Sequence, residues 1–261
     1  MILRDKVLLL TGASAGIGRC LAVELAARGA RLVLAGRSSE GLAATSRLLP
    51  PGCSRELIAD LAELAALPDL ATRAEAAFGQ IDGLVNNAGF APFRSFEAED
   101  PASIELILRT NTIAPITLTR LLLPALRRRP EALIAFTGSV FGSIGFPYYA
   151  SYSASKFALR GFAEALGREL HDSRIHILHA APRATRTRLT EKLGDMAAAT
   201  KMNIDPPELV ARRIAAAIDA DRKRITIGFP ESLFVKINGA FPGLVDGALA
   251  EQAAKMKPFA T

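Results

Sequence analysis

Three side chains near the middle of the chain have the types and spacing needed for proton transfer at an oxygen atom. Ser139 follows the apolar run at residues 133–137, and Tyr152 and Lys156 lie four positions apart in a helical pattern. Such positions share one helix face, so the phenol and the ammonium can occupy one site. A cation within roughly 4–6 Å lowers the pKa of a tyrosine from its ordinary value of about 10. With the Ser139 hydroxyl, the pair predicts protonation of a carbonyl or the reverse reaction on an alcohol.

A glycine-rich turn supplies the candidate site for the redox cofactor that this chemistry requires, since no side chain carries a hydride. The buried-strand pattern at residues 7–10 leads into TGASAGIG at 11–18, and a helix then extends to about residue 28. A second strand at 31–35 places the glycines in the strand–turn–helix context of dinucleotide binding. Gly12, Gly16 and Gly18 permit a tight turn and close approach to a pyrophosphate. A glycine turn without a ligand is the alternative.

Arg37, at the end of the second strand, decides between the two nicotinamide cofactors. Proteins that bind NAD usually carry an acidic residue here for the ribose 2′-hydroxyl, and neither Gly36 nor Arg37 is acidic. A guanidinium can instead pair with the 2′-phosphate of NADP(H), which we therefore expect, with NAD(H) as the alternative. An exposed arginine without a ligand is the competing interpretation. Ser38 and Ser39 either assist or cap the next helix.

Polar and small residues follow two further predicted strands. A strand at 56–59 precedes Asp60 and Leu61, and Asp60 either faces an adenine ring or caps a helix. A strand at 81–85 leads into NNAG at residues 86–89, which suits a loop across a cofactor crevice. A turn without function is the alternative.

The rest of the chain continues the alternation of helices and strands. A helical pattern at residues 101–129 contains Pro115 and a polar Asn111, which either faces solvent or is buried and hydrogen-bonded, holding a water beside Lys156. The remaining expected strands cover residues 132–137, 174–180 and 224–228, and the remaining helices cover 152–171 and 206–220. We expect residues 183–205 to form a loop with a short helix, a candidate lid over the substrate. His176 and His179 point to opposite faces of a strand, so we expect no metal site.

Composition argues against several other classes of protein. The 261 residues are 50% hydrophobic with a net charge of +6, enough apolar material for one large core. Cys20 and Cys53 form no disulfide framework, and neither a signal peptide nor a membrane span is expected, which favours a cytoplasmic setting. The arginines are scattered and tryptophan is absent, so we expect a small-molecule substrate and no nucleic acid.

Residues 229–261 form a distinct apolar segment, which Pro230 and Pro242 divide into two predicted helices. We expect a dinucleotide-binding and catalytic domain at 1–228 and a C-terminal helical extension packed on that domain or on a neighbouring subunit. The alternatives are a substrate-pocket wall or a membrane-surface contact.

In combination, these features resemble the short-chain dehydrogenase/reductase family. The resemblance rests on residues 11–18 and 86–89, on Asn111, on the Ser139–Tyr152–Lys156 group and on the segment from Pro182 to Thr187. It implies a Rossmann-like, doubly wound, seven-stranded parallel α/β sheet, hydride transfer with NADP(H) or NAD(H), and homodimers or homotetramers. Residues 90–100, 140–151, 183–205 and the C-terminal segment are expected to shape the pocket. An apolar pocket is suggested by Phe90, Phe93, Phe96, Phe141 and Phe146, with core packing as the alternative. We therefore expect a ketone or aldehyde reductase or an alcohol dehydrogenase. A non-enzymatic NADP(H)-binding sensor is the alternative.

The resemblance also implies residue roles. Tyr152 is the expected general acid/base, Lys156 lowers its pKa and holds the nicotinamide ribose, and Ser139 orients the substrate oxygen. Asn111 supports a water-linked proton relay. The implied cofactor contacts are Gly12, Ser14, Gly16, Ile17, Gly18, Arg37, Asp60, Leu61, Asn87, Ala88, Gly89, Tyr152, Lys156, Pro182 and Thr187. Two departures stand out: Arg183 replaces a usual glycine and puts a positive charge near the nicotinamide end, and Ala15 replaces a basic residue of some NADP-preferring members.

Overall fold

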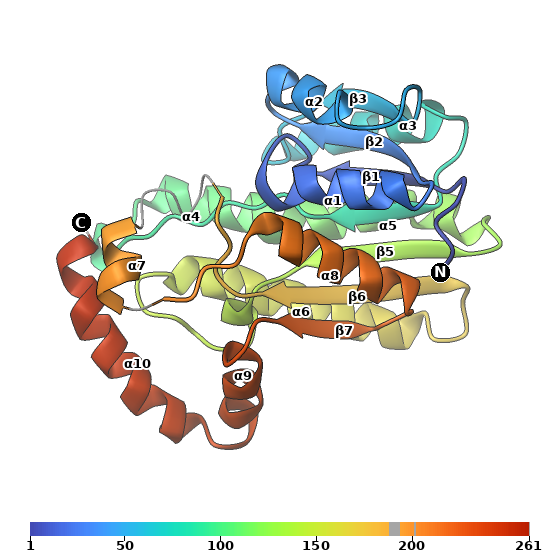
Figure 1. The fold of residues 1–261 in the computed structure, drawn as a ribbon. Helices are drawn as coiled ribbons and strands as arrows, with labels where there is room; N and C mark the ends of the chain where they lie inside the picture. Colours follow the sequence, from blue (N-terminus) through green and yellow to red (C-terminus); the bar gives the residue numbers. More distant parts are fainter. Residues whose placement is uncertain (188–193, 201, 261) are drawn as a thin grey trace.

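A seven-stranded sheet forms the centre of the computed structural model, which describes residues 1–187, 194–200 and 202–260. The strands are β1 (Val7–Thr11), β2 (Arg31–Gly36), β3 (Ser54–Ile58), β4 (Gly83–Asn86), β5 (Ala132–Thr137), β6 (Ile175–Pro182) and β7 (Arg224–Ile227). All neighbours pair in parallel, in the order β3-β2-β1-β4-β5-β6-β7, which confirms the expected doubly wound fold (Figure 1). The strand order runs outward in opposite directions from β1 and from β4. Sheets of this kind bind ligands at such a switch point, beyond the carboxyl ends of the strands.

Helices cover both faces of the sheet, which explains why the central strands are apolar on both sides. On one face lie α1 (Gly16–Ala27), α2 (Ser39–Ser46) and α8 (Pro207–Asp219), and on the other lie α3 (Leu67–Ala76), α5 (Ala114–Arg127) and α6 (Ala150–Glu169). Short 3₁₀ turns cover Leu64–Ala66, Phe96–Ala98, Val140–Gly142 and Lys257–Phe259. α6 begins two residues earlier than expected, so Tyr152 lies inside its first turn.

The long helix expected at residues 101–129 is interrupted. It consists of α4 (Pro101–Leu108), a π-helical turn (Arg109–Ile113) and α5. Pro115 has no amide hydrogen and cannot donate to the carbonyl of Asn111, four residues earlier. The wider turn precedes this proline and leaves Asn111 fully buried beside α6.

The C-terminal segment forms two helices that Pro242 separates, as expected: α9 (Glu231–Ala240) and α10 (Pro242–Met256). α10 packs against α7 (Gly194–Thr200), the short helix expected within residues 183–205, and α9 packs against β7 and the turn Val140–Gly142. Within the candidate lid, residues 188–193 and 201 lie outside the described residues.

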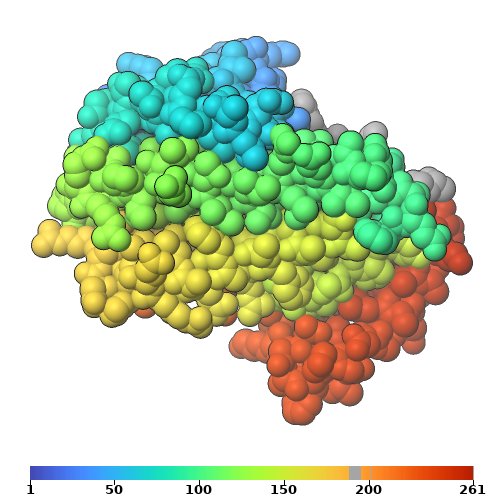
Figure 2. Space-filling view, turned by 180° about the vertical axis from the view of Figure 1, so that it is seen from behind, coloured from blue at the N-terminus to red at the C-terminus, as the bar shows by residue number. Residues whose placement is uncertain are grey.

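The two C-terminal helices project from the body of the molecule (Figure 2). They and their flanks keep large apolar side chains exposed, namely Phe229, Leu233, Phe234, Phe241, Leu244 and Phe259. None of the helices in the described ranges has the length and apolar character needed to cross a bilayer.

Candidate active site

The glycine turn between β1 and α1 has room for a phosphate group. Gly12 has a φ of 67°, and a Cβ at this position would lie 2.7 Å from the Cα of Ala88. A Cβ on Gly18 would overlap the carbonyl oxygen of Gly12, so both positions require glycine. Ala15, the N-cap of α1, offers no side-chain acceptor, and the first turn holds no acidic residue. The helix amides and the positive end of its dipole thus fit the diphosphate of a dinucleotide.

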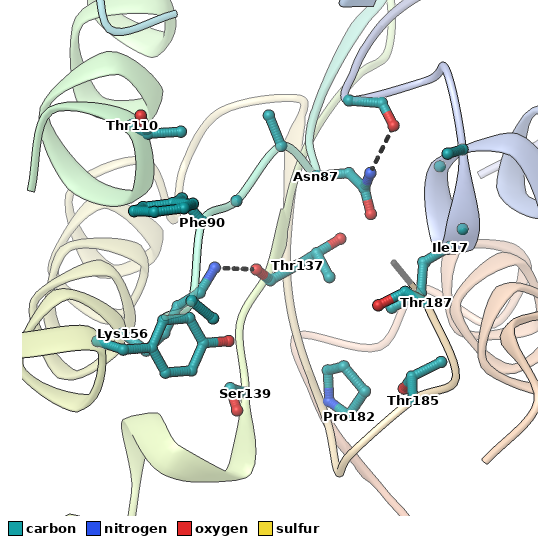
Figure 3. A pocket seen from close by; sticks show the side chains of 18 of the residues that line it. Ile17, Asn87, Phe90, Thr110, Thr137, Ser139, Lys156, Pro182, Thr185 and Thr187 are labelled. Atoms are coloured by element: carbon teal, nitrogen blue, oxygen red, sulfur yellow. Dashed lines mark hydrogen bonds between the residues drawn. The ribbon is translucent and has the colours of Figure 1, made fainter. Parts of the chain in front are cut away.

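A cavity of about 540 Å³ joins this turn to the expected catalytic residues (Figure 3). Every expected site residue except Asn111 lines it: Gly12, Ser14, Gly16, Ile17, Gly18, Arg37, Asp60, Leu61, Asn87, Ala88, Gly89, Ser139, Tyr152, Lys156, Pro182 and Thr187. The structure therefore brings together, in one cavity, residues from both halves of the sheet, while their individual roles stay predictions.

The loop after β4 is fixed against the glycine turn. The Thr11 hydroxyl accepts hydrogen bonds from the backbone amides of Asn87 and Ala88 at 3.0 and 3.1 Å. The Asn87 side chain donates to the Thr11 carbonyl at 3.1 Å. These bonds hold residues 87–89 at the cavity wall, next to the turn that would carry the phosphates.

Tyr152 and Lys156 reach the cavity from the first two turns of α6. The Lys156 side chain is buried, and its Nζ donates to the Thr137 carbonyl at 3.0 Å (Figure 3). Burial raises the pKa of Tyr152 to about 12, against an opposing hydrogen bond with Ser139, and burial lowers the pKa of Lys156 to about 8. The phenol pKa therefore lies above its ordinary value, because desolvation outweighs the hydrogen bond with Ser139, and the pKa-lowering role expected of Lys156 stays a prediction. At neutral pH, Tyr152 keeps its proton and can donate it.

Ser139 lies at the cavity wall as the N-cap of the turn that follows β5. Its hydroxyl accepts a hydrogen bond from the backbone amide of Phe141 at 3.1 Å. Figure 3 shows Ser139 and Lys156 on one side of the cavity and Pro182 and Thr185 on the other. A substrate oxygen bound between these sides can meet the Ser139 hydroxyl and the Tyr152 phenol together.

Asn111 lies behind the cavity wall rather than in it, and it is buried and hydrogen-bonded, one of the two alternatives above. Its Oδ1 accepts from the Phe90 amide at 2.8 Å, and its Nδ2 donates to the Phe90 carbonyl at 2.8 Å and to Ser155 at 3.1 Å. A Cβ on Gly89 would lie 3.6 Å from Asn111 Oδ1 and 3.7 Å from Lys156 Nζ. Asn111 Oδ1 and Lys156 Nζ therefore both lie close to one point beside Gly89.

Arg37 and Asp60 line the far end of the cavity. Their side chains are 70% and 42% exposed, and Nη1 of Arg37 lies 3.9 Å from the carboxylate of Asp60. An ion pair this long and this exposed contributes little to stability, so the Arg37 guanidinium is available to bind an anion. Ser38 accepts a hydrogen bond from the Gly41 amide and so serves as the N-cap of α2.

Comparisons with known proteins identify the family. A model described as short chain dehydrogenase matches residues 6–198. The chain belongs to this family. Dehydrogenase/reductase SDR family member 7B of Bos taurus is 32% identical over 269 residues, which cover 97% of this chain and 82% of that protein. The 3-oxoacyl-[acyl-carrier-protein] reductase FabG of Escherichia coli (strain K12) is 32% identical over 195 residues, 75% of this chain and 80% of that enzyme.

The fold of this short chain dehydrogenase is shared with solved members of the family. A short chain dehydrogenase/reductase from Burkholderia phymatum, solved in complex with NAD, superposes with a TM-score of 0.85 at 24% identity. The superposition covers 94% of this chain and 96% of that one. The expected family and fold class are confirmed, and the chain is a member of an oxidoreductase family with relatives named as reductases.

Arg183, where this short chain dehydrogenase departs from the family pattern, does not leave a free positive charge at the cavity. Its Nη2 pairs with Asp205 at 2.6 Å and its Nη1 with Glu231 at 3.0 Å. The expectation that Arg183 puts an unpaired positive charge near the nicotinamide end is therefore corrected, because two carboxylates offset that charge.

Sequence reasoning missed Leu106 in the apolar wall of the cavity. It lines this wall together with Phe141, Tyr149 and Met202, which lie in segments expected to shape the pocket, residues 140–151 and 183–205. Tyr149 precedes Tyr152 by three positions, so the i, i+3 relation on one helix face was an available signal, and their ring centroids lie 6.0 Å apart. Leu106 comes from a distant helix and carried no local signal. Within the described ranges, no group of three or more metal-ligating side chains forms.

Proposed function

We propose that this short chain dehydrogenase reduces an apolar ketone or aldehyde with NADPH, or oxidises the matching alcohol with NADP⁺. The supporting observation is the convergence of a protonated Tyr152, the Ser139 hydroxyl and the glycine turn on one cavity. When bound, the cofactor supplies or accepts the hydride. Ser139 orients the carbonyl oxygen, and Tyr152 donates its proton to that oxygen.

The protonation states favour reduction near neutral pH. Burial holds the pKa of Tyr152 at about 12, so the proton is present, and the pKa of Lys156 at about 8 leaves its amine charged. When the proton leaves Tyr152, the nearby ammonium stabilises the phenolate that forms. Asn111 supports this step by holding residue 90 and, we propose, a relay water beside Lys156.

The wall beside Tyr152 supports an apolar substrate. The rings of Phe141 and Phe146 stack with centroids 4.2 Å apart, and Phe141 lies 5.3 Å from Tyr149. Met202 extends this surface at the cavity. Such a wall binds hydrocarbon through area removed from water, with the Ser139 hydroxyl as the polar anchor.

Arg37 supports NADP(H) over NAD(H). Its guanidinium is 70% exposed at the end of β2 and makes only a long contact with Asp60. A 2′-phosphate there would gain a charge-assisted, bidentate partner. NAD(H) stays the alternative cofactor.

The deciding experiment compares the wild type with Tyr152→Phe on a panel of apolar ketones, aldehydes and alcohols with both cofactors. We expect Tyr152→Phe to lose at least about 10²-fold in turnover, because the proton donor is removed, while cofactor binding is retained. Tyr148→Phe is the matched control, since the Tyr148 hydroxyl donates to the Ala253 carbonyl, away from the cavity. Unchanged turnover in Tyr152→Phe would refute the assignment. Cofactor binding without turnover on the panel would favour the sensor hypothesis.

We further propose a homodimer or homotetramer built on α5 and α6, whose outer surfaces occupy one face of the molecule (Figure 2). Ile113 and Phe157, at the start of α5 and in α6, are each 42% exposed, which supports burial by a second copy. Light scattering after size exclusion measures the mass, and Phe157→Glu should shift it toward the monomer. The cytoplasmic location stays a prediction. The division into a catalytic domain at 1–228 and a C-terminal extension at 229–261 also stays a prediction.

A further inference from the structure

Arg183 joins three segments that are far apart in the sequence. Its Nη2 donates to Asp205 at 2.6 Å, and its Nη1 donates to Glu231 at 3.0 Å and to the Phe229 carbonyl at 2.9 Å. The Arg183 side chain is 16% exposed and that of Asp205 only 6%. Water and salt therefore screen this cluster less than they screen the exposed ion pairs of the molecule.

The backbone around Arg183 leaves space for this particular side chain. A Cβ on Gly228 would lie 2.5 Å from Cδ and 2.8 Å from Cγ of Arg183, and Gly228 has a φ of 113°. The Arg183 amide donates to the Ile227 carbonyl at 3.0 Å, which continues the pairing of β6 with β7. The stem of the arginine thus passes over a position where any side chain would collide with it.

The same cluster supports the cavity wall opposite Ser139. Pro182, Ala184, Thr185 and Thr187 line the cavity, and so does part of Arg183 itself. The Arg186 amide donates to the Asp205 carbonyl, and the Asp205 amide donates to the Ala184 carbonyl, both at 2.9 Å. A Cβ on Gly16 would lie 2.9 Å from Cγ2 of Thr187, so this wall reaches the glycine turn.

We propose that Arg183 is a positioning residue that couples the C-terminal helices to the cofactor-binding wall. Glu231, in the first turn of α9, and Asp205 hold the guanidinium between them, so docking of residues 229–260 fixes residues 182–187 at the cavity. Three acceptors from two separate segments require the planar fork of an arginine, which a lysine cannot reproduce. The identity of the bound ligand rests on the proposed function; the coupling itself does not.

The first test measures the dissociation constants of NADPH and NADH for the full chain. Glu231→Gln removes one carboxylate charge without removing bulk and leaves Asp205 paired. We expect both dissociation constants to rise by about threefold to tenfold, with a much smaller change in kcat, because the wall is looser while the reacting groups are untouched. Arg183→Lys should weaken binding similarly, and the double variant should add little to either single change.

The matched control is Glu75→Gln, which breaks the exposed pair between Glu75 and Arg128, remote from the cavity. We expect its dissociation constants to equal those of the wild type. Equal values for Glu231→Gln and Glu75→Gln would overturn the proposal, and so would strictly additive effects in the double variant.

The second test needs neither cofactor nor substrate. Hydrogen exchange of the Arg186 and Asp205 amides reports the bonds that fix the wall. We expect faster exchange in Glu231→Gln than in the wild type or in Glu75→Gln, at equal melting temperature. If exchange is faster in Glu231→Gln but the wild type binds no dinucleotide, the coupling is supported and the proposed function is refuted. Unchanged exchange would refute the coupling itself.

Discussion

The Lys156 ammonium lies 5.8 Å from the centroid of the Tyr152 ring and donates its hydrogen bond to Thr137 instead of to the phenol. The two groups are neighbours without a direct bond, and burial decides both protonation equilibria. It raises the pKa of Tyr152 to about 12 and lowers that of Lys156 to about 8. At neutral pH the pair is a phenol beside an ammonium, an acid whose conjugate base is stabilised once the proton has left.

Ultraviolet titration of the wild type and Tyr152→Phe tests the state of the phenol. Because burial raises the pKa of Tyr152 to about 12, we expect the two proteins to show the same phenolate absorbance up to about pH 10. Burial raises the pKa of Tyr149 in the same direction, so it does not interfere in this range. A component with a midpoint below pH 9 that Tyr152→Phe lacks would contradict the prediction.

Lys156 should make stability depend on pH in a defined window. Burial depresses its pKa from 10.5 to about 8, so the unfolded chain binds more protons between these values and stability rises with pH. The contribution is fully present above about pH 10.5 and is lost as pH falls through about 8. Between pH 7 and pH 9, the unfolding free energy of the wild type should gain about 1 kcal/mol relative to Lys156→Met in denaturant titrations. If the unfolding free energies of the wild type and Lys156→Met changed with pH in parallel, the Lys156 amine would not be desolvated and the prediction would fail.

The fold and the composition of the cavity were predictable from sequence because their causes are local. Buried parallel strands show as apolar runs, as at β1 and β5, and Gly12 and Gly18 follow from the steric demands of one turn. The break before α5 was partly predictable, because Pro115 removes a donor from the helix, although the π-helical turn itself was not.

The charge environment of the site was not predictable because it depends on tertiary packing. Asp205 and Glu231, the partners of Arg183, lie 22 and 48 positions away in the sequence, and no local pattern links them. The spacing of Tyr152 and Lys156 suggested an opposite-charge effect, but desolvation of both groups depends on how α6 packs against the sheet.

Arg37→Asp should reverse the preference between the two cofactors. The substitution removes a cation that can pair with a 2′-phosphate and introduces a carboxylate that repels it and can accept from a ribose hydroxyl. We expect the ratio of kcat/KM for NADPH over that for NADH to fall by at least about tenfold. Arg47→Asp makes the same charge change at an exposed position outside the cavity and should leave the ratio unaltered. Equal ratios in both variants would remove the argument for NADP(H).

Asn111→Leu should destabilise the protein through groups that lose their partners. The substitution conserves volume approximately, but it leaves the partly buried Phe90 amide and carbonyl without the bonds they make at 2.8 Å to the fully buried Asn111. A polar group left unpaired away from water costs about 1–3 kcal/mol, so the urea midpoint should fall below that of the wild type. Asn203→Leu, at an exposed position, should stay within about 0.5 kcal/mol of it. Similar midpoints for both variants would contradict the prediction and would mean that Phe90 is held by other contacts.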